Sequence, residues 1–274
     1  MINSKSIENF WTRGDIFSRV HDAMSEAGLI NKELNIEDLF PIDQYHARGI
    51  AATVDLGKRM PIKKNKRILD IGCGLGGPAR YYAKEFECII TGIDITPSFV
   101  EIGNEFNKLT SMSDNVELLV GNGEVLEFDN ESFDGGYSQH VTMNISDRIK
   151  FFSEAFRVLK SGAFFAFTEH GLGPNGNPIF PLPWADTEDM SFLLPLEKTL
   201  SILKQTGFSD IEIVETADKY ISGYEKLIKP KPDNKNPVLG IHVIGGDSMN
   251  ERSRNSMQSI KENRTLPFEI VCKK

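Results

Sequence analysis

Short apolar runs, each long enough for one buried strand, alternate along the chain with amphipathic stretches. The runs lie at 67–71, 88–93, 116–120, 163–168, 211–215 and 268–272. Several of the stretches between them space their apolar residues three or four positions apart, the period of a helix with one buried face. These stretches begin near Pro78, Pro97, Ser146 and Pro195. Strands that alternate with helices predict an open, mostly parallel α/β sheet with helices on both faces.

Three segments fall outside this alternation. Residues 1–62 contain an amphipathic helix and are predicted to form an N-terminal helical cap on a main domain that spans 63–274. Residues 169–190, rich in glycine and proline, and residues 217–265 each leave the carboxyl end of a predicted strand. Ligands of open α/β sheets bind at these carboxyl ends, so both segments are predicted to be lids over a site.

The most informative segment joins the first strand to the first helix through a loop with four glycines, Asp70-Ile-Gly72-Cys-Gly74-Leu-Gly76-Gly77. Glycine permits a tight turn and a close approach of the backbone to a ligand. The helix that follows presents free N–H groups. The second strand ends in Asp94, about 20 residues after the glycines, where a carboxylate can bind a ribose. The segment therefore predicts a site for a nucleoside-containing cofactor.

Two cofactor classes fit this loop. Gly72-x-Gly74-x-x-Gly77 matches the dinucleotide fingerprint, which is a weak signal on its own. Asp70-x-Gly72-x-Gly74-x-Gly76 is the pattern of class I S-adenosylmethionine (SAM) methyltransferases, and the chain resembles that family here. Asp70 favours SAM, because a carboxylate in the loop repels a pyrophosphate and attracts the cationic methionine end of SAM.

The resemblance continues along the chain. Ser132-Phe133-Asp134, before a fourth strand, is similar to the family's "SFD" segment, and residues 157–162 are similar to its "RVLKPGG" turn, with Ser161 in place of the proline. Asn122 stands where many relatives carry aspartate beside the adenine, and its amide oxygen can accept the same hydrogen bond. The resemblance covers about residues 66–216 and the last strand. It implies a Rossmann-like sheet of seven mostly parallel strands whose last strand is antiparallel.

The same resemblance implies which residues contact the cofactor. SAM is the expected cofactor, S-adenosyl-L-homocysteine the expected product, and no metal is expected. The glycine loop would hold the methionine half, the second strand end the ribose and adenine, the third strand end the adenine edge, and the fourth strand end the sulfonium. In that order the residues are Asp70, Gly72 and Gly74, then Asp94 and Ile95, then Asn122, Gly123 and Glu124, and finally Gln139.

Two further segments point to a branch of the family. Residues 138–145 and the Asp43-Gln44-Tyr45-His46 segment are similar to small-molecule methyltransferases of the sarcosine/dimethylglycine and ubiquinone/menaquinone-biosynthesis types. The resemblance implies N-methylation of an amine, with O- or C-methylation of a small natural product or a quinone or isoprenoid precursor as the alternative. An NAD-dependent oxidoreductase is the alternative from another class, and it would need a substrate domain after residue 216 that the chain is too short to supply.

Histidines near the predicted strand ends are the candidates for acid–base chemistry. Methyl transfer needs mainly alignment of the nucleophile and exclusion of water, with a base where a proton must leave. His140 is the first candidate and His46 the second, although each also fits an ordinary hydrogen-bonded loop histidine. The residues expected to contact the substrate are Gln44, Tyr45, Asn144, His170 and Trp184.

Composition excludes other classes of partner. The formal net charge of −8 disfavours nucleic acid as the main substrate. The three cysteines lack metal-site spacing and fit a reduced cytosolic protein. No apolar run has membrane-spanning length, and the N-terminus lacks a signal-peptide core. We therefore expect a cytoplasmic monomer or homodimer that acts on a small molecule and binds neither nucleic acid nor membrane.

Overall fold

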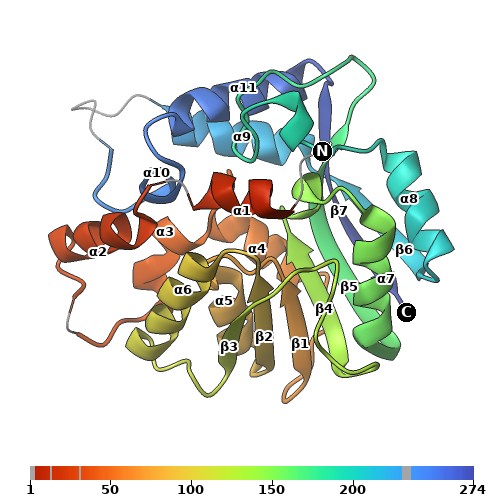
Figure 1. The fold of residues 1–274 in the computed structure, drawn as a ribbon, viewed down its shortest axis with the longest axis horizontal. Helices are drawn as coiled ribbons and strands as arrows, with labels where there is room; N and C mark the ends of the chain where they lie inside the picture. The colour runs from red at the N-terminus through yellow and green to blue at the C-terminus, as the bar shows by residue number, and fades with distance from the viewer. Residues whose placement is uncertain (1–3, 13, 31, 230–235) are drawn as a thin grey trace.

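The computed structural model describes residues 4–12, 14–30, 32–229 and 236–274. Within these ranges seven strands form one sheet in the order β3-β2-β1-β4-β5-β7-β6 (Figure 1). The strands are β1 Arg67–Ile71, β2 Ile89–Asp94, β3 Val116–Val120, β4 Phe133–Gln139, β5 Leu159–Leu172, β6 Ser209–Glu215 and β7 Thr265–Lys273. The first five pair in parallel, and β7 is antiparallel to both β5 and β6. The predicted Rossmann-like fold class is confirmed.

Helices cover both faces of the sheet because side chains alternate between the faces along each strand. Ile68 of β1 packs in an apolar cluster with α4 and α5, whereas Leu69 packs in a second cluster with α7 and α8. The helices around the sheet are α4 Ile50–Gly57, α5 Gly77–Phe86, α6 Pro97–Leu109, α7 Arg148–Val158 and α8 Leu196–Gln205.

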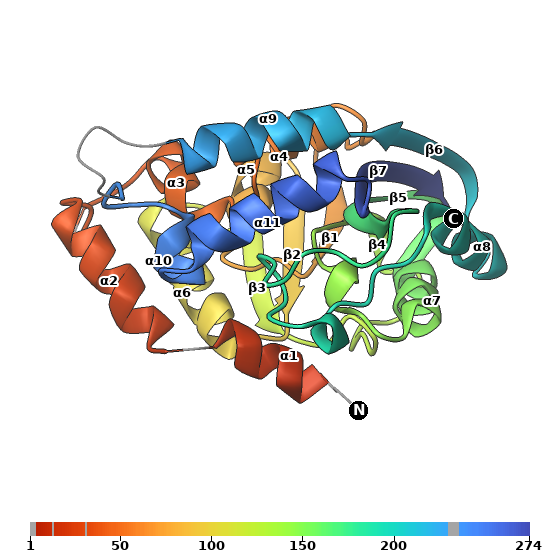
Figure 2. The same ribbon diagram turned by 90° about the horizontal axis from the view of Figure 1, so that it is seen from above.

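The remaining helices gather over one end of the sheet (Figures 1 and 2). They come from the N-terminal segment and from the segment between β6 and β7, and Figure 2 shows α9 and α11 running side by side across the strands. These helices are α1 Ser4–Trp11, α2 Ile16–Glu26, α3 Phe40–Asp43, α9 Ala217–Ile228, α10 Ile241–Gly245 and α11 Met249–Lys261. Short 3-10 turns complete the chain: η1 Ile36–Leu39, η2 Thr142–Asn144 and η3 Glu188–Met190. The division into a cap and a main domain stays a prediction.

Two local expectations differ from the structure. β5 extends to Leu172, so the start of the segment predicted as a lid from residue 169 is a strand, in which Glu169 pairs with Phe268 of β7. The helical stretch predicted to begin near Ser146 is α7, which begins at Arg148 and is capped by Asp147, whose side chain accepts from the backbone N–H of Lys150. None of the helices in the described ranges is long and apolar enough to span a membrane.

Candidate functional site

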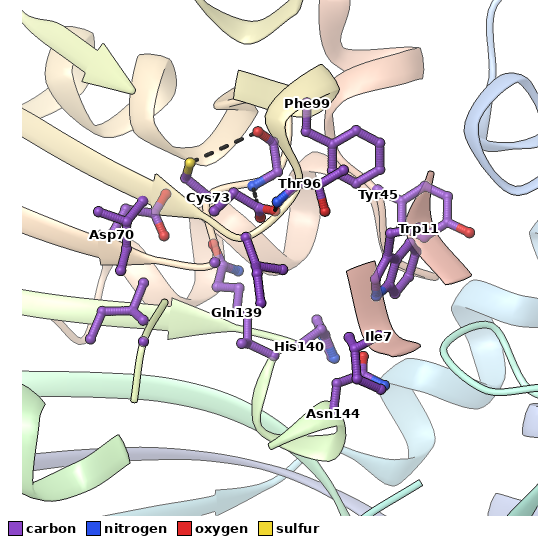
Figure 3. A pocket seen from close by; sticks show the side chains of 18 of the residues that line it. Ile7, Trp11, Tyr45, Asp70, Cys73, Thr96, Phe99, Gln139, His140 and Asn144 are labelled. Carbon is purple, nitrogen blue, oxygen red and sulfur yellow. Dashed lines mark hydrogen bonds between the residues drawn. The ribbon is translucent and has the colours of Figure 1, made fainter. Parts of the chain in front are cut away.

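A cavity of about 170 Å³ lies at the carboxyl ends of β1, β2, β3 and β4 (Figure 3). Figure 3 shows Asp70 and Gln139 on the sheet side of this cavity, with Trp11 and Tyr45 from the N-terminal segment across from them. All nine residues that the sequence predicts as cofactor contacts line it: Asp70, Gly72, Gly74, Asp94, Ile95, Asn122, Gly123, Glu124 and Gln139. The fold thus brings four separate strand ends to one space.

The glycine loop shapes the floor of the cavity. Gly72, Gly74 and Gly76 all have positive φ angles, of 83°, 53° and 75°, which residues other than glycine rarely adopt. The Gly72 N–H donates to the Ile93 carbonyl at 2.8 Å and fixes the loop to β2. A Cβ at Gly72 would lie 2.1 Å from a methyl group of Val141, whereas a Cβ at Gly74 would meet no atom within 4 Å. Gly72 is therefore required by the protein's own packing, and Gly74 faces open space that a ligand can fill.

The ionisable residues that line this cavity are mainly acidic. Asp43, Asp70, Asp94 and Glu124 line it, and no lysine or arginine is among the described residues that do. Burial raises the pKa of Asp70 to about 8, although Tyr137 donates a hydrogen bond to Asp70 Oδ2 at 2.7 Å. Asp70 and Asp94 have no ion-pair partner among the described residues. Carboxylates buried in this way favour a positively charged ligand and disfavour a pyrophosphate.

Asp94 is held in place by the backbone. It accepts hydrogen bonds from the N–H groups of Gly74 and Thr96, both at 2.9 Å. Burial nevertheless raises the pKa of Asp94. At the end of β4, the side-chain nitrogen of Gln139 is buried and has no hydrogen-bond partner. Asp70 and Asp94 without a cation beside them in the described part of the chain, the unpaired side-chain nitrogen of Gln139 and the glycine-lined floor fit SAM, which carries an ammonium, a sulfonium and a carboxylate.

Asp94→Ala should weaken SAM binding at least about tenfold. Hydrogen bonds to a charged group contribute about 1.5–3 kcal/mol, and the variant removes the carboxylate that is predicted to bind the ribose hydroxyls. Calorimetric titration with SAM measures the effect. Asp114→Ala, at an exposed aspartate, is the matched control and should bind SAM normally. Equal affinity of the two variants would remove Asp94 from the cofactor site.

Asp43 is a cavity residue that the sequence reasoning did not single out. It forms an ion pair with Arg80 at 3.0 Å, and both side chains are fully buried. Arg80 also donates to the carbonyls of Leu75 and Gly103, which ties the N-terminal segment to the glycine loop. Gln44, the next residue, does not line the cavity, because its side-chain oxygen accepts from the Thr53 hydroxyl at 2.6 Å. Its predicted substrate contact is not supported by this placement.

A second compartment of about 50 Å³ adjoins the first. Trp11, Tyr45, His46 and His140 line both spaces, so the two are continuous. Its other walls come from β5, the loop after it, α9 and α11. Residues that line only this compartment include Met143, His170, Trp184, Tyr220, Tyr224 and Met249.

Three histidines meet at the junction of the two spaces. The ring centroids of His46 and His140 are 5.4 Å apart, and those of His140 and His170 are 5.6 Å apart. Both ring nitrogens of His46 and Nδ1 of His170 are buried without a partner. Burial lowers the pKa of His46 to about 4 and of His170 to about 3, and it lowers the pKa of His140 well below its usual range. All three imidazoles are therefore neutral near pH 7. No group of side chains in the described ranges is arranged to hold a metal ion.

His140 occupies a strained backbone position. Its φ is 57°, in the left-handed region that non-glycine residues rarely adopt, directly after β4. Its N–H donates to the carbonyl and hydroxyl of Thr168, at 3.2 and 3.1 Å, and its Nε2 is hydrogen-bonded to the hydroxyl of Tyr220. Strain of this kind persists only where surrounding contacts impose it, and it clusters at functional sites.

The predicted substrate residues occupy different places. Tyr45 lines both spaces, His170 and Trp184 line the second, and Asn144 lines the first. Asn144 also donates to the Trp184 carbonyl at 3.0 Å, so it holds the loop in place.

Sequence reasoning missed Trp11, Tyr220 and Tyr224 as wall residues of the second compartment. The two tyrosines are four residues apart on α9, and this helical spacing of aromatic residues within a predicted lid was the available signal.

Comparisons with known proteins agree with this geometry. The family model described as "Methyltransferase domain" matches residues 69–167. Sarcosine/dimethylglycine N-methyltransferase of Aphanothece halophytica is 33% identical over 189 residues, which cover 69% of this chain and 68% of that protein. Other curated relatives are matched over a smaller share, and the chain spans about a third of the length of several of them.

Solved structures share the fold. Phosphoethanolamine N-methyltransferase 2 of Haemonchus contortus, in complex with phosphomonomethylethanolamine and S-adenosylhomocysteine, has a TM-score of 0.75 at 22% identity, over 100% of this chain and 61% of that one. A putative sarcosine dimethylglycine methyltransferase from Galdieria sulphuraria has a TM-score of 0.72 at 17% identity, over 94% of this chain and 98% of that one.

Proposed function

Because the chain belongs to the class I SAM-dependent methyltransferase family, we propose that it transfers a methyl group from SAM to the nitrogen of a small amine. The observation that carries this proposal is the second compartment, which is walled by aromatic rings. Trp11, Tyr45, Trp184, Tyr220 and Tyr224 all line it. Aromatic faces attract ammonium groups, and they do so more strongly where water is excluded.

The charge of the product distinguishes nitrogen from the other acceptors. SAM, when bound, supplies an activated methyl group on a sulfonium. Methylation of a tertiary amine leaves the positive charge on the acceptor, whereas methylation of a hydroxyl or carbon, with loss of a proton, leaves a neutral product. The compartment has aromatic walls and no charged residue among the described residues that line it. Such walls stabilise a positively charged, N-methylated product more than a neutral O- or C-methylated product.

The junction histidines supply the proton chemistry. An amine is mostly protonated near pH 7 and attacks only as the free base. Burial lowers the pKa of a bound ammonium as it lowers those of the histidines. His140 lies between the two spaces, and its Nε2 contacts the Tyr220 hydroxyl. In the tautomer in which Nε2 carries the hydrogen and donates it to that hydroxyl, Nδ1 has a free lone pair that can orient the amine and accept its proton, which leaves an imidazolium. Trp11 and the loop through Trp184 exclude water from the reacting atoms.

A panel of paired acceptors tests this proposal. The purified protein is incubated with SAM and with amines, alcohols and phenols of matched skeleton, such as N-methylbenzylamine, benzyl alcohol and 4-methylphenol. Formation of S-adenosylhomocysteine is measured, and the methylated atom is identified by NMR. We expect kcat/KM for amines to exceed that for matched oxygen acceptors by at least about 100-fold, since cation–π attraction acts on the positive charge that develops on nitrogen and not on a neutral ether product. Preferential methylation of oxygen or carbon would overturn the proposal.

A further inference from the structure

We propose that the amine acceptor carries no anionic group, so that the second compartment accepts a small amine whose other substituents are uncharged. This inference rests on the proposed function and narrows its substrate class. It separates this chain from any enzyme that recognises its amine through a neighbouring carboxylate or phosphate. The observations that support it are the neutral side chains that line the compartment and the nearby arginines and lysine that form ion pairs outside it.

The walls of the compartment are neutral throughout the part that the structure describes. Aromatic rings and the apolar side chains of Met143, Leu227, Ile241 and Met249 form most of the surface. The buried polar atoms that lack a partner there belong to His46, His170 and Ser253. All three are uncharged near pH 7, since burial lowers the pKa of both histidines. An anion that entered would lose its hydration and find no opposite charge.

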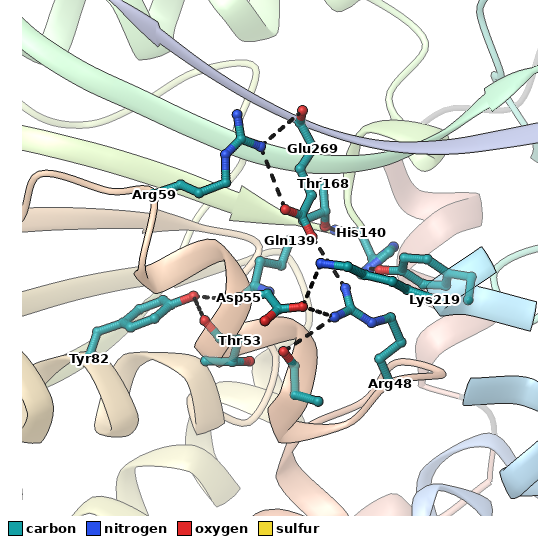
Figure 4. A network of polar contacts seen from close by, with 12 residues as sticks. Arg48, Thr53, Asp55, Arg59, Tyr82, Gln139, His140, Thr168, Lys219 and Glu269 are labelled. Carbon is teal, nitrogen blue, oxygen red and sulfur yellow. Dashed lines mark hydrogen bonds and ion pairs between the residues drawn. The ribbon is translucent and has the colours of Figure 1, made fainter. Parts of the chain in front are cut away.

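The nearest cation, Arg48, is committed to carboxylates outside the compartment (Figure 4). Its guanidinium carbon lies 5.6 Å from the centroid of the Tyr220 ring, but Arg48 does not line the compartment. Its side chain is 6% exposed, and it donates to Glu269 at 3.2 Å and to Asp55. Glu269 is itself 1% exposed and also pairs with Arg59 at 3.6 Å. Turning Arg48 toward a substrate would remove the closer of these two cations from a buried carboxylate, which is unfavourable.

The other neighbouring cations are paired in the same manner. Lys219 of α9 contacts Asp55 at 2.9 Å and is half exposed. Arg252 of α11 donates to the Leu182 carbonyl at 2.7 Å and also contacts Asp186. Neither side chain lines the compartment. Arg48 and Lys219, which Figure 4 labels, therefore form ion pairs near the compartment but do not line it.

Pairs of amines of almost the same size, one with a carboxylate and one with an amide, test this inference, with kcat/KM referred to the concentration of the free base because amidation also makes the amine less basic. N,N-dimethylglycine is compared with N,N-dimethylglycinamide, and sarcosine with sarcosinamide, because the amide replaces the carboxylate at almost the same size. Binding to the complex with S-adenosylhomocysteine is followed by tryptophan fluorescence, since both tryptophans of the chain, Trp11 and Trp184, line the compartment. We expect the amides to bind more tightly and to be methylated with at least about 100-fold higher kcat/KM.

A positive charge introduced into the wall should weaken the preference for amides over acids. Leu227→Lys places an ammonium on the compartment side of α9 and should reduce the amide-to-acid ratio at least about tenfold. Ser222→Lys adds the same charge to the same helix at an exposed position outside the compartment, and it should leave the ratio unchanged. If Leu227→Lys does not fold, the amide-to-acid ratio of kcat/KM for the unmodified protein tests the inference by itself.

Each outcome distinguishes this inference from the function beneath it. Equal or better methylation of the acids would overturn the inference and leave N-methylation standing. Methylation of oxygen or carbon acceptors with no amine accepted would overturn both. Binding of S-adenosylhomocysteine without binding or methylation of any amine in the panel would also overturn both.

Discussion

Replacing His140 with asparagine should lower kcat by at least about 100-fold and leave SAM affinity within about threefold. A positioned acid or base contributes about 10²–10⁴-fold to a rate, and His140 lies where the cofactor cavity meets the aromatic compartment. Asparagine tolerates the left-handed backbone at this position better than alanine does. Single-turnover rates and calorimetric titration with SAM measure the two quantities separately.

Two companion variants locate the effect. Tyr220→Phe removes the hydroxyl that contacts His140 Nε2 and should give a smaller loss of kcat, because the imidazole stays but loses its partner. His46→Asn tests the second histidine at the same junction. If His140→Asn instead weakened SAM binding and left turnover per bound cofactor intact, His140 would be a cofactor-loop residue, and His46 would become the better candidate for the base.

Replacing Asp70 with asparagine should have two opposite effects. SAM affinity at pH 8 should fall at least about 100-fold, because the variant removes the buried carboxylate that a cationic ligand would neutralise. The ligand-free protein should become more stable, with an unfolding temperature at least about 3 °C higher at pH 8. Asparagine can still accept the hydrogen bond that Tyr137 donates, so the packing is retained.

The sign of the stability change follows from the pKa of Asp70. Burial raises it to about 8, against about 3.9 for an aspartate in an unfolded chain. Between these values the folded protein binds a proton that the unfolded chain releases, so this residue lowers stability progressively as pH rises from about 4 to about 8. The side-chain amide of the Asp70→Asn variant does not titrate, so the variant does not lose stability in this way as pH rises. A site that destabilises the empty protein in this way is typical of one built for a ligand.

Ligand binding should show the same titration. Binding of a cation requires ionised Asp70, so SAM affinity should increase between pH 6 and pH 8 and level off above that. The increase should be absent in Asp70→Asn and present in Asp114→Asn, which changes an exposed aspartate. Calorimetry at four pH values and thermal unfolding of the free proteins provide both readouts. A variant that bound SAM normally, or that was less stable at pH 8, would contradict the assignment.

The cofactor half of the candidate site could be predicted because its residues lie in short, contiguous segments of the sequence. Asp70 and the glycines lie within one strand–loop–helix unit, and Asp94 follows at a spacing set by the next unit. The turn demands glycine at positive φ, and the ligand's charge demands a carboxylate, so residue type and spacing together are specific. The alternation of apolar runs and helical stretches likewise determined the order of elements and the class of sheet.

The substrate half was decided by packing between distant segments. Gln44 and Tyr45 are neighbours in one motif, yet Gln44 turns to Thr53 while Tyr45 faces the cavity. No pattern local to Trp11 or Tyr220 shows that the two share a wall, because they come from helices about 200 positions apart in the chain. The end of β5 was misjudged for the same reason, since its last residues are strand only through pairing with β7. Local sequence thus determined where the cofactor is predicted to bind. Only the tertiary contacts of α1, α9, α11 and β5 decided the shape and charge of the space beside it, because side-chain direction and burial depend on partners far along the chain.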